Sequence, residues 1–128
     1  MACHSCGTGD LGLLMRIEQR GVGPGEPGHD IVYAHSVVLR CGRCGGGEIE
    51  ILEHDCFDPD DVSDQYSWYL LGPSDAHRLV EALRACPTPL SGECRCALHE
   101  TLRAGCRGLD AAPGPGRVQR IKLEEIGL

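Results

Sequence analysis

Apolar and polar positions alternate along three segments in the first half of the chain. The first segment covers residues 11–18, the second covers residues 31–39, and the third is the short run Glu48–Ile51. The alternating apolar or large members of the first two are Leu11, Leu13, Met15 and Ile17, and then Ile31, Tyr33, His35, Val37 and Leu39. A period of two is typical of β-strands. We therefore predict an antiparallel three-stranded unit, with the glycine- and proline-rich residues 20–29 as a hairpin loop.

The second half of the chain changes to a helical pattern. Residues 66–71 predict one more strand, which Gly72-Pro73 ends, and Ser74 is a favourable helix N-cap. The apolar stripe that follows has helical spacing and consists of Ala76, Leu79, Val80, Leu83 and Cys86. His77 lies one position off this stripe, so we expect it at the surface.

A second, shorter helix is predicted from a cap at Ser91 to Leu102 or Arg103, with Gly105 as its end. Residues 111–116 have the composition of a linker. The chain then regains apolar residues, and we expect Ile121 and Leu123, with Val118 as a weaker candidate, to be buried. This last segment predicts an edge strand added to the sheet, with a tail that binds a partner as the alternative.

The composition predicts a thin hydrophobic core. The 128 residues include one Trp, one Phe and three Tyr, against eighteen Gly, eight Pro and nine Cys. Small cores of this kind need metal ions or disulfides for stability. The start of the chain lacks the pattern of a signal peptide and no apolar run is long enough to span a bilayer, so we expect a cytoplasmic protein. In a reducing compartment, cysteine pairs are metal ligands more often than disulfides.

The net charge of -7 is concentrated in the first part of the chain. Residues 1–75 hold 13 acidic and 4 basic side chains, and residues 48–64 hold eight acidic ones with no Lys or Arg. We interpret the acidic stretch as a solvated loop, with a binding face for a basic partner as the alternative; its spacing does not match a calcium loop. The charge disfavours nucleic acid as a partner and favours a protein.

Two C-x-x-C pairs are the most informative motif. Cys3 and Cys6 precede the first strand, Cys41 and Cys44 follow the second, and a glycine follows each pair. Antiparallel pairing of the two strands brings all four sulfur atoms together, which predicts a structural zinc site; iron is the alternative. With strands on either side, residues 1–53 resemble the zinc-ribbon, rubredoxin-like superfamily. The 34 residues between Cys6 and Cys41 exceed a minimal ribbon.

A second zinc site is predicted in the second half. Cys86, Cys94, Cys96 and His99 lie within 14 residues, and Cys96 and His99 share one face of the predicted helix. The alternative is that Cys86 belongs to the core and the C-x-C pair is free. Cys106 could replace His99 only if the helix continued past Gly105. This segment also resembles the tail of small uncharacterised bacterial cysteine-rich proteins, which implies no activity.

These patterns predict an α+β protein with an antiparallel zinc-ribbon sheet and a small helical C-terminal segment. The segments are the ribbon hairpin with its third strand (1–53), the acidic loop and strand (54–73), the helical segment with the second metal site (74–110), and the linker with the terminal strand (111–128).

The predicted function is a small protein-interaction or accessory module in which both zinc ions are structural. An enzyme with one catalytic Cys/His zinc and a nucleic-acid-binding zinc ribbon are the alternatives. His54-Asp55-Cys56 places a histidine near a thiol, but two residues on one strand reach the same side through the period of two alone. We therefore expect no catalytic residue and leave Cys56 and Cys106 without an assigned role.

Overall fold

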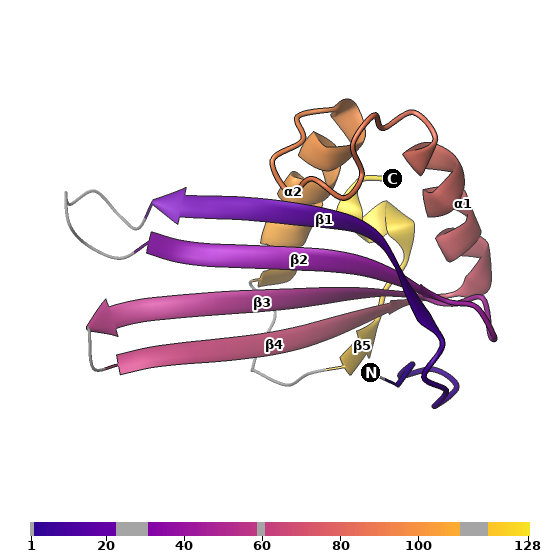
Figure 1. Cartoon of the computed structure of the whole chain (residues 1–128), viewed down its shortest axis with the longest axis horizontal. Helices are drawn as coiled ribbons and strands as arrows, with labels where there is room; N and C mark the ends of the chain where they lie inside the picture. The colour runs from indigo at the N-terminus through magenta and orange to yellow at the C-terminus, as the bar shows by residue number, and fades with distance from the viewer. Residues whose placement is uncertain (1, 23–30, 59–60, 111–117) are drawn as a thin grey trace.

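The computed structural model describes residues 2–22, 31–58, 61–110 and 118–128 (Figure 1). The predicted hairpin loop falls largely on residues 23–30, which lie outside the described residues. The strands are β1 (Leu11–Val22), β2 (Ile31–Cys41), β3 (Gly47–Asp58), β4 (Asp61–Leu71) and β5 (Val118–Arg120). The helices are α1 (Pro73–Leu83), α2 (Ala97–Asp110) and the 3₁₀-helix η1 (Leu123–Ile126).

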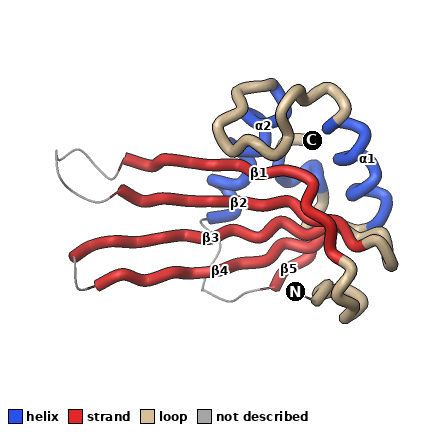
Figure 2. Tube along the Cα trace, in the orientation of Figure 1, coloured by secondary structure: helices blue, strands red, loops and turns tan. Residues whose placement is uncertain are grey.

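The strands form one sheet in the order β1-β2-β3-β4-β5 (Figure 2). The first four pair antiparallel, and β5 pairs parallel with Trp68–Leu70 of β4. The predicted α+β class is confirmed. The predicted edge strand near the C-terminus is confirmed only for Val118–Arg120, because Leu123–Ile126 forms a 3₁₀-helix. In Figure 1 the helices lie beside one end of the long strands, and the opposite end extends beyond them.

The core lies between one face of the sheet and the helices. The sheet contributes Met15, Ile17, Val38, Ile49, Ile51, Tyr69 and Leu71, and the helices contribute Leu79, Leu102, Leu123 and Ile126. Fully burying one such side chain stabilises the fold by about 1.5–3 kcal/mol. Ile121 and Leu123 are buried as predicted, whereas Val118 is 48% exposed. We call the sheet face away from the helices the outer face.

The predicted alternation is right about strands but partly wrong about faces. In β1 the register shifts between Leu13 and Met15, so Leu13 is 37% exposed while Leu14 packs against the core. In β2 the core residue is Val38, and its neighbour Val37 points to the outer face. The run Val37-Val38-Leu39 is apolar throughout, so its pattern alone does not determine which face is buried.

The sequence predicts a loop for the acidic stretch, but in the structure the stretch belongs to the β3–β4 hairpin. The two strands pair from Gly47 opposite Leu71 to Asp58 opposite Asp61, with a register shift between Cys56 and Asp58. Asp and Glu have low β-propensity, but pairing with neighbouring strands outweighs this preference. The described acidic residues of this stretch therefore lie on paired strands.

Both predicted helix starts are corrected. Helix α1 begins at Pro73, Gly72 is its N-cap without a side-chain hydrogen bond, and Ser74 already lies inside it. Helix α2 begins at Ala97, while Ser91 lies in a turn before it, where its amide donates to the Thr88 carbonyl.

The predicted end of the second helix is also wrong, because α2 passes through Gly105 to Asp110. A Cβ atom at Gly105 would lie 2.4 Å from the backbone oxygen of Ile126. This glycine is therefore explained by the close approach of η1 and not by a helix end.

Candidate metal centres

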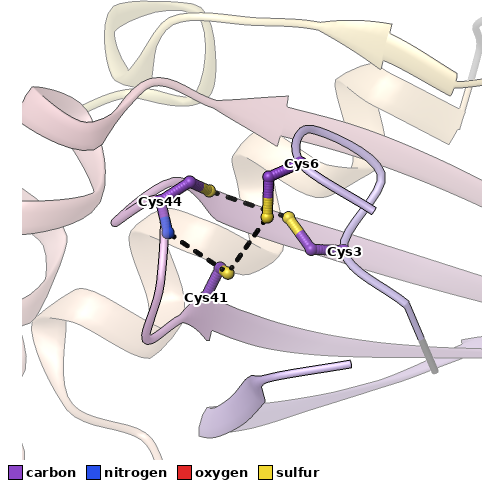
Figure 3. Close-up of side chains that lie close together, drawn as sticks. All are labelled: Cys3, Cys6, Cys41 and Cys44. Carbon is purple, nitrogen blue, oxygen red and sulfur yellow. Dashed lines mark hydrogen bonds between the residues drawn. The ribbon is translucent and has the colours of Figure 1, made fainter. Parts of the chain in front are cut away.

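The first cluster joins the two C-x-x-C pairs, as predicted (Figure 3). Pairing of β1 with β2 places Leu11 opposite Cys41 and so brings the two turns together. The Sγ atoms of Cys3 and Cys44 are 3.8 Å apart, those of Cys6 and Cys41 are 3.6 Å apart, and all four lie within 4.8 Å of one another. A tetrahedral ion with metal–sulfur bonds of about 2.3 Å requires sulfur atoms about 3.8 Å apart, so the cluster fits one ion.

The two turns share one backbone geometry. The Gly7 amide donates to the Cys3 carbonyl at 2.8 Å, and the Gly45 amide donates to the Cys41 carbonyl at 3.0 Å. Both glycines have positive φ, +76° and +77°, a conformation that L side chains rarely adopt. In the second turn the Cys44 amide also donates to Cys41 Sγ at 3.5 Å, which stabilises a thiolate there.

The local contacts separate the acidities of these thiols. Donation from the Cys44 amide, helped by the Thr8 hydroxyl, lowers the pKa of Cys41 from 9.0 to about 6. The Thr8 hydroxyl also lowers the pKa of Cys6. In contrast, burial raises the pKa of Cys3 to about 11. A metal ion that binds here must therefore displace a proton from Cys3.

A buried carboxylate, which the sequence did not single out, fixes the first turn on the outer face. Glu48 is 1% exposed, and it accepts a hydrogen bond from the backbone amide of His4. The His4 Nδ1 atom lies 3.1 Å from a Glu48 carboxylate oxygen, and its ring centroid lies 5.0 Å from that of Trp68. Glu48 is therefore a positioning residue for the segment that carries Cys3 and Cys6.

The second cluster joins Cys86, Cys94, Cys96 and His99, the four residues that the sequence predicted. Cys86 follows α1, the other two cysteines precede α2, and His99 lies in the first turn of α2. The Sγ atoms of Cys86 and Cys94 are 3.8 Å apart. The His99 Nδ1 atom lies 3.4 Å from Cys86 Sγ and 3.2 Å from Cys96 Sγ, so this group also has the dimensions of a four-coordinate site.

The hydrogen bond at the far side of the ring sets the tautomer of His99. Its Nε2 atom lies 3.0 Å from the backbone oxygen of Arg16, so Nε2 carries the hydrogen and Nδ1 keeps its lone pair toward the thiols. Burial lowers the pKa of His99, which favours the neutral imidazole that binds metals. The Thr88 hydroxyl lowers the pKa of Cys94 to about 7, and burial raises that of Cys86 to about 11.

Arg103, which supports the second cluster from α2, was not identified by the sequence pattern. Arg103 is 8% exposed and donates to the backbone oxygens of Glu18 and Gly92, at 3.1 and 2.7 Å. It also contacts Glu100 at 2.8 Å. No local pattern distinguishes it from the surface arginines, because its partner Glu18 lies 85 positions away in the sequence.

The two unassigned cysteines lie apart from these clusters. Cys106 is fully buried in the core, so it does not replace His99, although α2 does continue past Gly105. The backbone of Cys56 pairs with Val62 in the β3–β4 hairpin, but the side chains of the His54-Asp55-Cys56 triplet lie outside the described residues.

Comparison of the chain with protein-family models, curated proteins and solved structures found no match. Within the described segments, no helix combines the length and apolar character needed to cross a membrane. The function is therefore inferred from the chemistry of the two clusters. Each offers four protein ligands at distances suited to one metal ion, and this set fills a tetrahedral shell.

Proposed function

We propose that this protein is a zinc-binding interaction module in which two structural zinc ions hold a five-stranded sheet that binds a protein partner. The observation that carries the proposal is that each cluster has four protein ligands. A catalytic zinc needs a position for water or substrate, whereas a structural zinc has four protein ligands. The order of turn, hairpin and turn in the first cluster supports assignment to the zinc ribbons.

Zinc is favoured by the ligand types. Four thiolates, or three thiolates and one imidazole, are the usual ligand sets of structural zinc. The seven cysteines of the two clusters form no disulfide bonds, as expected of zinc ligands in a reducing compartment, and this supports a cytoplasmic location. With thiolate ligands, the two bound sites would carry net charges of -2 and -1, which adds to the acidic character of the protein.

The outer face is the surface that we assign to the partner. Tyr66 is 40% exposed and stacks on Trp68 with ring centroids 6.1 Å apart, and Trp68 donates to Glu50 at 3.0 Å. Val118, which pairs with Trp68 from the edge strand, is 48% exposed. Exposed aromatic and aliphatic side chains in a cluster favour a protein contact.

Charge determines the kind of partner. The two strands β3 and β4 continue from this aromatic group and contain seven of the eight acidic residues in residues 48–64, a stretch without Lys or Arg. We therefore propose a partner segment that combines basic residues with apolar ones, and that is protein rather than nucleic acid, because phosphates would be repelled.

Two measurements test this function. X-ray absorption on the purified protein should give two zinc ions per chain with only sulfur and nitrogen ligands, and an oxygen ligand would favour the enzyme instead. Proteins cross-linked to the chain should include a basic one that the variant Tyr66→Lys with Val118→Lys loses. Leu90→Lys is the control, because Leu90 is also exposed, at 55%, but belongs to the turn before α2. Equal capture by both variants would refute the proposed surface.

A further inference from the structure

Strand β1 is an edge strand of the sheet, and the segment that carries the second cluster covers it. We call residues 86–103 the metal lobe. The backbone amide of Arg16 donates to the Pro89 carbonyl at 2.9 Å, and that of Glu18 donates to the Gly92 carbonyl at 3.0 Å. These two amides point away from β2, where an uncovered edge strand would offer them to another chain.

The carbonyl groups of the same two residues are also covered. The Arg16 oxygen lies 3.0 Å from Nε2 of His99, and the Glu18 oxygen accepts a hydrogen bond from Nε of Arg103 at 3.1 Å. All four outward backbone groups at Arg16 and Glu18 are therefore bonded to the metal lobe. One of the four partners, His99, is itself a ligand of the second cluster.

The turn between α1 and α2 has few apolar contacts of its own. Its residues 87–96 bury only Gly92 and Cys94, while Leu90 is 55% exposed. Gly92 lies so close to β1 that an added Cβ would be 2.3 Å from Cγ of Glu18. Because the turn buries so little apolar area, the metal–ligand bonds must supply most of the free energy that holds it against β1.

We infer that the metal lobe is a metal-dependent cover of the β1 edge, and that removal of its metal lets β1 pair with β1 of a second copy of this chain. The inference rests on the second metal site and is independent of the outer-face partner. This pairing differs from non-specific association because the sequence of β1 specifies one register.

That register follows from the positions of the outward groups. In an antiparallel pair centred on Ile17, Arg16 of one copy lies opposite Glu18 of the second copy, and Glu18 lies opposite Arg16. The four amides and carbonyls of each copy that the lobe now covers would then bond across the two-fold axis. Opposite charges also face each other at both positions, which favours the pair, whereas like charges would oppose it.

The first test removes the second metal and measures the oligomeric state of the full chain. The variant Cys94→Ser with Cys96→Ser should retain one zinc ion per chain by native mass spectrometry. Light scattering should give a dimer, whereas the wild type with two ions should be a monomer. Retention of two ions, or a monomer with one ion at millimolar concentration, would overturn the inference.

The second test checks the register by charge. In the same double-serine background, Arg16→Glu should abolish the dimer, because it places Glu opposite Glu, and so should Glu18→Arg. A mixture of these two variants should form a heterodimer, since each pair is again oppositely charged. Arg84→Glu makes the same charge change on α1 and should leave the dimer intact. A dimer that ignores these changes uses another surface and refutes the inference.

A variant that keeps all four ligand residues tests the covering of β1 independently of metal binding. Gly92→Leu cannot fit against Glu18, so it should lift the turn and give a dimer with two ions bound. It also decides the matter if the double-serine variant fails to fold. Hydrogen exchange reports directly on the edge: the Arg16 and Glu18 amides should exchange at least tenfold faster in the dilute, one-ion protein than in the wild type. Unchanged protection would mean that the lobe stays in place without metal.

Discussion

Replacing Arg103 with methionine should strongly destabilise the protein. Arg103 is 8% exposed, and its guanidinium donates to the backbone oxygens of Glu18 and Gly92. Methionine has a similar length and no donor, so it fills much of the same space but leaves both oxygens without this partner. The change therefore isolates the hydrogen bonds of the arginine from its packing.

The magnitude follows from these two oxygens. The Glu18 oxygen loses its partner, which costs about 1–3 kcal/mol for a buried acceptor. The Gly92 oxygen keeps the hydrogen bond from the Glu18 amide but loses a charged one worth about 1.5–3 kcal/mol, so the two together give about 2.5–6 kcal/mol. Methionine also removes the cost of burying the guanidinium charge, and water reaches part of the site. Both effects reduce the expected loss in the free energy of unfolding to about 2–4 kcal/mol. The contact with Glu100 adds little, because that carboxylate is 48% exposed and screened by water.

Urea unfolding of the zinc-loaded protein, followed by circular dichroism at fixed free zinc, measures this loss. Arg95→Met is the matched control, because Arg95 also contacts Glu100, at 3.7 Å, but is 85% exposed. We expect that control to change the free energy of unfolding by less than about 0.5 kcal/mol. A similar small change for Arg103→Met would refute the reasoning that its bonds to β1 and the metal lobe are stabilising.

Three further predictions concern the metal sites and the core. Gly45→Ala should destabilise the zinc-loaded protein by about 1–2 kcal/mol in urea, because alanine is strained at positive φ. Gly12→Ala should not, because the φ of Gly12 is not positive and its added Cβ would make only an ordinary contact with the Arg40 oxygen, at 3.8 Å. Leu102→Ala should cost about 2–5 kcal/mol in the same assay without changing the zinc content by mass spectrometry. Zinc affinity should fall as pH falls from 8 to 7, by at least tenfold at each site. The pKa values of Cys3 and Cys86 are about 11, so each thiol must release a proton to bind the metal. Competition with a chromogenic chelator measures the zinc affinity, and an affinity that does not change with pH would contradict the prediction.

Strands β1 and β2 and the two Cys/His clusters were predictable from local sequence. Alternation locates β1 and β2, and a C-x-x-C pair at the start of one and at the end of the other implies that their sulfur atoms meet. The second set was predictable for a different reason, since four ligands within 14 residues can meet without knowledge of the sheet. In both clusters the spacing of the residues along the chain is enough to bring the side chains together.

Features that depend on long-range contacts were not predictable. The register shift between Leu13 and Met15 places the Leu13 side chain on the face opposite to that of Met15. Nothing in the composition of β1 marks this shift. Glu48 lies in a run where Glu and Ile alternate, so it looks the same as Glu50, although only Glu48 meets the His4 backbone. Arg103 bonds to Glu18, 85 positions away, and only the folded chain brings them together.

The position of the cover in the chain has a consequence for synthesis on the ribosome. The first metal site is complete in sequence once Cys44 has been made, so β1 and β2 can pair early. Pro89, the first residue that covers β1, is made about 45 residues later. At about 5–20 residues per second, the β1 edge of a nascent chain stays open for several seconds. During that interval, neighbouring chains on one messenger RNA would be the nearest source of a second β1.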